Sequence, residues 1–240
     1  NLEERKEQVI NSIREQEKLT PELEKKILAA STLVAVEDLY LPYRPKRKTR
    51  ASIAKEKGLE PLANLVLMQL TKTPLLKEAE HYISEEKGVL TAEEALNGAK
   101  DILAERIAET AEYRTYIRKA TFQEGSLDSS ARDGNAESVY EMYYNFTEPV
   151  KKAAGHRILA LNRGEKEKIL TVKITAPEEK ILRYLEKKVI TRENPETARV
   201  LREVTEDSYK RLISPAIERE IRSELTENAE AGAIKVFGKN

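Results

Sequence analysis

The spacing of apolar residues predicts helices along most of the chain. Apolar positions recur at helical spacing, three, four or seven residues apart, with polar and charged residues between them, as in Leu2, Val9, Ile10 and Ile13. This spacing is typical of a surface helix that buries one stripe. The clearest instance begins at Ala95 and continues through Ala99, Ile102, Leu103 and Ile107.

Helix start signals agree with this periodicity. Thr and Asn accept hydrogen bonds from free N–H groups, and Pro suits the first helical turn. In Thr91-Ala92-Glu93-Glu94 the Thr and Glu side chains form a capping box. The signals that we interpret as helix starts are Thr20-Pro21, Ser52, Glu60-Pro61, Thr91, Pro177 and Asn194-Pro195. The last long helix is expected from about Ser214 to Ala231.

The segment from Ser52 to Leu70 allows two interpretations. Ser52 caps a short helix, Ile53 to Lys57, which Gly58 ends, and a second helix follows. A helix-turn-helix has this pattern, and so do two packed helices joined by a glycine turn.

Only one segment alternates as a strand does. Leu170, Val172 and Ile174 lie two residues apart, which predicts one half-buried strand within residues 168–175, with no identifiable partner. Gly125 to Asn135 lacks periodicity and is rich in turn-forming residues, so we expect a loop and a seam between subdomains. The predicted fold is mainly α and multihelical, with at most a short β element and two helical subdomains, 1–125 and 136–240.

Composition limits the class of protein. Lys plus Arg equals Asp plus Glu, 42 of each, so no global basic field attracts polyanions. Cysteine is absent, which excludes disulfides and suits a cytoplasmic protein. No apolar run approaches the ~20 residues of a membrane span. The chain begins without Met in a helical pattern, which indicates a piece of a longer protein.

Catalytic signatures are missing from the sequence. There is no nucleophile elbow, no phosphate-binding glycine loop and no dinucleotide fingerprint. The only histidines are His81 and His156, and His156 is best interpreted as a capping or surface residue. We therefore expect no enzyme, catalytic residue, metal site, cofactor or small-molecule substrate.

A basic stretch is the strongest candidate for binding. Pro42 and Pro45 disfavour a helix, so Leu41 to Lys46 is expected to run extended, with Tyr40 and Tyr43 as anchors. The five basic residues are Arg44, Lys46, Arg47, Lys48 and Arg50. They could contact nucleic-acid phosphates while Tyr43 stacks on a base, or they could pair with acidic helices. A second, weaker basic group comprises Lys151, Lys152, Arg157 and Arg163.

Several segments, in the same order, resemble the bacterial transcription accessory protein family, Tex. They are Asn11-Ser12-Ile13-Arg14-Glu15-Gln16, Lys18-Leu19-Thr20-Pro21-Glu22-Leu23-Glu24, Glu37 to Arg50, Lys57-Gly58-Leu59-Glu60-Pro61-Leu62-Ala63 and His156 to Gly164. The resemblance implies a multihelical N-terminal region followed by RNase H-like, helix-hairpin-helix and RNA-binding OB-fold domains. It implies that Ala233 to Asn240 lies where the RNase H-like domain would begin.

Two functions remain open at this point. In the first, the chain is the helical scaffold of a nucleic-acid-binding transcription factor, and the basic stretch adds contacts to RNA or DNA. In the second, it is a protein–protein adaptor that meets the transcription machinery. There, Tyr40, Tyr43 and the aromatic cluster from Tyr140 to Phe146 would pack against a partner if exposed, and would be core if buried.

Overall fold

A computed structural model describes residues 1–45 and 47–238, with side chains through residue 232. The fold is mainly α-helical with one small sheet, as the sequence predicts. Contacts divide the chain into two compact units. Unit 1 comprises residues 1–115 and 182–213, and unit 2 comprises residues 116–181 and 214–240. The expected domains, 1–125 and 136–240, stay a prediction.

Unit 1 begins with three helices around their own core. They are α1 (Leu2–Glu15), α2 (Pro21–Ala29) and α3 (Leu33–Tyr40). The hydroxyls of Thr20 and Thr32 accept from the N–H groups of Leu23 and Ala35, each at 3.1 Å, which confirms the predicted start at Thr20. The core residues are Val9, Ile10, Ile13, Ile27, Val36 and Tyr40. The apolar stripe of the sequence is therefore the buried face.

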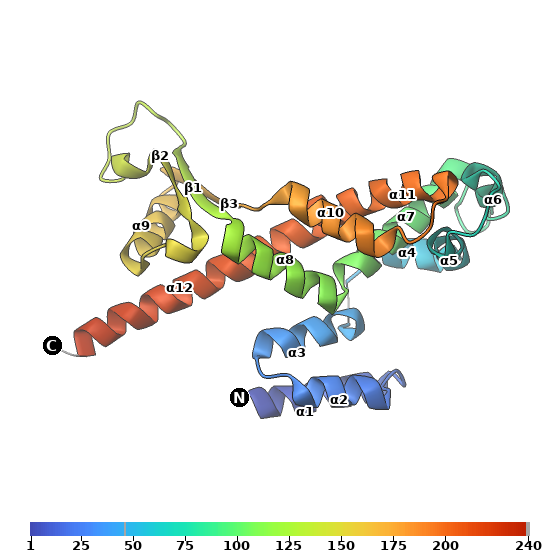
Figure 1. Ribbon diagram of the computed structural model, residues 1–240, viewed down its shortest axis with the longest axis horizontal. Helices are drawn as coiled ribbons and strands as arrows, with labels where there is room; N and C mark the ends of the chain where they lie inside the picture. The colour runs from blue at the N-terminus through green and yellow to red at the C-terminus, as the bar shows by residue number, and fades with distance from the viewer. Residues whose placement is uncertain (46, 239–240) are drawn as a thin grey trace. The chain divides into compact units, whose positions relative to one another are not determined.

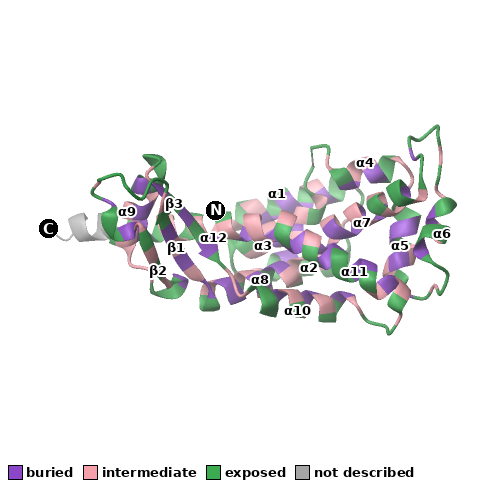
Figure 2. Ribbon diagram, turned by 90° about the horizontal axis from the view of Figure 1, so that it is seen from above, coloured by how far each residue is buried: buried purple, intermediate pink, exposed green. Residues whose placement is uncertain are grey.

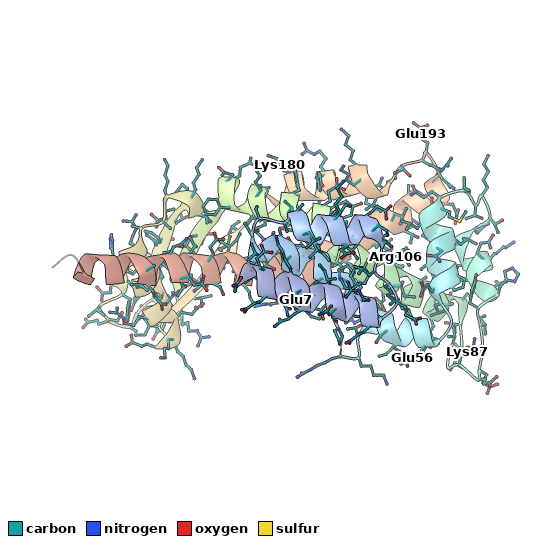
Figure 3. The ribbon with its side chains drawn as sticks, turned by 90° about the horizontal axis from the view of Figure 1, so that it is seen from below. Glu7, Glu56, Lys87, Arg106, Lys180 and Glu193 are labelled. Carbon is teal, nitrogen blue, oxygen red and sulfur yellow. The ribbon has the colours of Figure 1, made fainter. Side chains whose placement is uncertain are left out.

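The next helices pack on α7 (Ala92–Ala108). They are α4 (Arg50–Glu56), α5 (Glu60–Met68) and α6 (Leu75–Glu80), joined later by α11 (Pro195–Asp207). The inner face of α7 is buried, as the purple positions in Figure 2 show. On its exposed side Arg106, labelled in Figure 3, donates to the Oδ1 of Asn64 at 3.1 Å. Because α4 and α5 both lie against α7, the arrangement agrees with two packed helices joined at Gly58, where φ is +75°.

At two predicted helix starts, the hydrogen bonds of the capping residues differ in part from the prediction. Thr49, not Ser52, caps α4, and Ser52 supplies the other half of that capping box. At α7, Thr91 accepts from Glu94 N at 3.1 Å as predicted, but the Glu94 carboxylate accepts from Leu90 N at 2.8 Å. The start of α4 therefore lies within one turn of the predicted cap, and α7 starts at the predicted residue.

The turn after α5 is tied to the turn between α10 (Glu178–Val189) and α11. Gln69 is buried and has a positive φ of 59°. Its side-chain amide donates to Val189 O at 2.9 Å and accepts from Thr191 N at 3.0 Å. Asn194, which caps α11, donates to Gln69 O at 3.1 Å. These bonds satisfy buried backbone groups between segments far apart in sequence.

Unit 2 contains an antiparallel sheet of order β2-β1-β3 (Figure 1). Its strands are β1 (Ser126–Ala131), β2 (Asn145–Pro149) and β3 (Leu170–Thr175). The strand predicted at residues 168–175 is confirmed as β3. The loop predicted from Gly125 to Asn135 is wrong over β1, which is the central strand. Its Ser and Asp residues form a strand because both neighbouring strands satisfy its backbone.

Helices α8 (Ala111–Glu124), α9 (Gly155–Lys166) and α12 (Ser214–Gly238) supply the helical part of unit 2, with α8 entering from unit 1. A π-helical turn, Ser208–Ile213, precedes α12, which extends past the expected Ala231. Lys180, labelled in Figure 3, pairs with Glu124. Gly164 lies inside α9 and does not end it: a Cβ there would lie 2.5 Å from Leu170 Cδ1, so packing against β3 requires glycine.

The outer edge of β3 is covered by side chains of α12. Glu218 accepts from Ile174 N at 2.9 Å, and Arg222 donates to Val172 O at 3.4 Å. These are the β3 backbone groups that face away from β1. These two backbone groups are therefore not free to pair with another strand at this edge.

Candidate nucleic-acid interface

The chain turns sharply at the start of the basic stretch. After α3, Leu41–Tyr43 forms a 3₁₀ turn with Pro42 in its first positions, and Arg44 is extended. The extended course predicted for Leu41 to Lys46 is therefore wrong over the first three residues. Pro fixes a φ that also fits a helical first turn, so Pro42 permits the turn that follows α3.

Both predicted anchors hold this turn to the core of α1–α3. Tyr40 is buried, and its hydroxyl lies 2.9 Å from the Ser12 hydroxyl. Tyr43 packs against the same core, and its carbonyl accepts from Gln16 Nε2 at 2.7 Å. The turn therefore presents the following residues from a fixed position.

Arg44 is bound within the protein. It donates to the Glu37 carboxylate at 2.6 Å, and Arg5 donates to the same carboxylate at 2.5 Å. Both guanidinium carbons lie over the Tyr40 ring, 5.8 Å from its centroid for Arg44 and 5.3 Å for Arg5. The hydrogen bond from Arg5, with the charges of both arginines, holds the pKa of Glu37 below its ordinary value. Arg44 thus follows the ion-pair alternative.

The next cations differ from Arg44. Arg47 and Lys48 are exposed, and neither has an ion pair with any residue that the structure describes. Arg50, exposed in the first turn of α4, lies near Asp101. Burial raises the pKa of Asp101, and the charges of Arg211 and Arg50 oppose that rise. Lys46 lies outside the described residues.

The aromatic cluster is mostly core. Tyr140 and Tyr143 are buried, and the Tyr143 ring meets Phe146 edge-on at 5.3 Å between centroids. The neighbouring Val139 and Met142 are instead highly exposed. The sequence did not indicate that Val139 and Met142 are exposed, because the prediction for this segment concerned its aromatic residues.

The second basic group is divided as well. Arg157 pairs with Glu148 at 2.9 Å, whereas Lys151, Lys152 and Arg163 are exposed. His81 and His156 are exposed too, which agrees with the surface interpretation of His156.

The described part of the chain has neither a candidate metal cluster nor a candidate membrane-spanning helix. No group of three or more His, Cys, Asp or Glu residues there could hold a metal ion. No helix there is both long enough and apolar enough to cross a membrane.

The fold and the exposed cations Arg47, Lys48 and Arg50 define a mainly helical region with a candidate polyanion interface. Residues 71–237 match the family model described as Tex central region-like. The chain belongs to the Tex family, as its sequence suggested.

Curated relatives cover the whole chain or nearly so. Uncharacterized protein YdcI of Bacillus subtilis is 51% identical over 243 residues, covering 100% of this chain and 34% of the relative. Transcriptional accessory protein Tex of Neisseria gonorrhoeae is 35% identical, covering 100% of this chain and 32% of the relative. S1 RNA-binding domain-containing protein 1 of Homo sapiens is 30% identical, covering 96% and 24%. The chain therefore spans about a third or less of these relatives.

Proposed function

We propose that this chain is the helical scaffold region of a nucleic-acid-binding transcription accessory protein, and that its basic stretch contacts the backbone phosphates of the nucleic acid. The names of the relatives support the first part: one is a transcriptional accessory protein and another carries an S1 RNA-binding domain. The exposed cations of the basic stretch support the second part.

The observation that carries the phosphate contact is the exposure of Arg47 and Lys48 without an ion pair to any described residue. A cation already paired with a carboxylate has little to gain from a phosphate, whereas an unpaired one releases counterions when it binds. We therefore assign the contacts to Arg47 and Lys48, and give Arg44 the role of fixing the turn. We add Arg50, because it is exposed and, although near Asp101, has no ion pair with a described residue. A contact from Lys46 stays a prediction from the sequence.

We propose that the region has no catalytic activity, works in the cytoplasm and uses no cofactor. RNA or DNA is the proposed partner of the longer protein, together with components of the transcription machinery. The adaptor alternative keeps one supporting feature, the exposed pair Val139 and Met142.

A charge-removal variant tests the proposal. Arg47, Lys48 and Arg50 are changed to Gln, and binding to labelled single-stranded RNA, single-stranded DNA and duplex DNA is followed by fluorescence anisotropy. The matched control changes Lys25, Lys77 and Lys187 to Gln, three exposed lysines of unit 1. We expect the first variant to lose at least tenfold in affinity at low salt while the control keeps the affinity of the native chain. Equal losses would indicate a nonspecific charge effect and contradict the assignment.

A further inference from the structure

Unit 2 exposes two large apolar side chains at one end of its sheet. Val139 is 85% exposed and Met142 is 72% exposed. Both lie in the connection between β1 and β2, beside the exposed acids Glu137 and Glu141, which have no ion pair among the described residues. We name these four residues the knob.

The knob stands on a well-fixed base. The Tyr144 hydroxyl donates to Ala136 O at 2.8 Å and lies 2.8 Å from the Ser138 hydroxyl, which accepts from Tyr140 N at 3.1 Å. Ser129 of β1 donates to Tyr143 O at 2.6 Å. Because tyrosines on both sides are anchored, Val139 and Met142 are held outward before any partner arrives. Such preorganisation lowers the entropic cost of association.

A slot of about 250 Å³ lies elsewhere in unit 2. Its apolar walls include Phe122, Val150, Ile158 and Leu225. Lys151 borders it, and the exposed Lys152 and His156 lie within five residues of Lys151 in the sequence. Among the described residues that line the slot, Glu224 is the one acid. Small-molecule sites usually occupy about 300–1,000 Å³, so this volume suits one or two inserted side chains better.

The knob and the slot of one chain cannot meet. The knob precedes β2, whereas Val150 of the slot follows it, and a strand of this length spans roughly 17 Å. Along α9 the separation is similar: Tyr140 packs at Gly164, and the slot lies at Gly155 and Ile158. Nine residues of helix correspond to about 14 Å.

We infer that the knob of one chain docks into the slot of a second copy. The knob offers two apolar side chains beside the carboxylates of Glu137 and Glu141, and the slot offers an apolar recess beside the exposed ammonium groups of Lys151 and Lys152. None of these four charged groups has an ion pair among the described residues. Opposite charges around an apolar centre steer the encounter and fix its orientation. This self-association is independent of the proposed phosphate contacts, which use unit 1.

Charge reversal tests the inference without disturbing the core. One variant carries Glu137→Lys and Glu141→Lys, and the other carries Lys151→Glu and Lys152→Glu. All four residues are exposed, so both variants should keep the circular dichroism of the native chain. The control carries Lys119→Glu and Lys166→Glu, two exposed lysines of unit 2 that neither belong to the knob nor line the slot.

Sedimentation equilibrium up to about 100 µM, which detects a micromolar Kd, provides the readout. We expect the native chain and the control to self-associate, and each reversed variant alone to lose at least tenfold in association constant. An equimolar mixture of the two variants should regain it, since each reversed knob then meets a reversed slot. A native chain that stays monomeric would overturn the inference and leave the knob for a different protein. Association that the reversals do not weaken, or that mixing does not restore, would overturn it equally.

Discussion

At the scale of single residues, Glu37 determines which arginine of the basic stretch is bound within the protein. Its carboxylate receives both Arg5 and Arg44, and these two guanidinium groups cover the buried Tyr40 ring. The sequence does not indicate the contact between Arg5 and Glu37, because the two residues lie 32 positions apart. One arginine of the basic stretch is thereby part of the fold.

Stability should depend on the ionisation of Glu37. Its pKa is lower in the folded chain, so its contribution is complete above the ordinary value of 4.5 and is lost as the pH falls through the lowered pKa. We expect Glu37→Gln to lower the free energy of unfolding by about 1 kcal/mol or less at pH 7, because the ion pairs of Glu37 with Arg5 and Arg44 are partly solvated. Urea unfolding across a pH series should show this difference shrinking below pH 4.5. A difference that is constant with pH would contradict the ion-pair account.

Gln69 provides a second test at the scale of one residue. Gln69→Ala removes the amide that serves Val189 O and Thr191 N, and unsatisfied buried groups cost about 1–3 kcal/mol. Gln69→Gly relaxes the positive φ but removes the same amide, so it should also destabilise the chain. Urea unfolding measures both, with the exposed Gln123→Ala as a control. A stabilised glycine variant would show that backbone strain outweighs the hydrogen bonds.

At the scale of elements, the sequence predicted helices better than strands. Helical periodicity and capping residues are local, and they located most helix starts. β3 was visible because its apolar residues alternate. β1 was missed because its sequence, Ser126 to Ala131, is polar and gains its stability from neighbours on both sides. Local pattern cannot report partners that lie far along the chain.

The covered edge of β3 yields a prediction for one amide. Glu218→Ala removes the acceptor of Ile174 N, so the hydrogen exchange of that amide should accelerate at least tenfold. The control is Glu227→Ala, an exposed residue of the same helix. Exchange is read residue by residue by NMR. An Ile174 amide that stays fully protected would mean that Glu218 is dispensable for closing the edge.

At the scale of the whole molecule, function must come from local segregation of charge. The chain has no net charge, so a polyanion meets attraction only where cations lack acidic partners. The sequence indicated the right segment for such a site but could not separate its residues. Arg44 lies beside Glu37 only because the chain turns after α3, whereas Arg47 and Lys48 remain exposed.

The most direct test of the central claim is the salt dependence of binding to single-stranded RNA. Each phosphate contact contributes about −0.7 to the slope of log K against log salt. If Arg47, Lys48 and Arg50 each contact a phosphate, changing all three to Gln should reduce the slope by about 2. The variant with Lys25, Lys77 and Lys187 changed to Gln should keep the native slope. An unchanged slope in the first variant, or no binding by the native chain at low salt, would contradict the phosphate interface and leave the region as a scaffold.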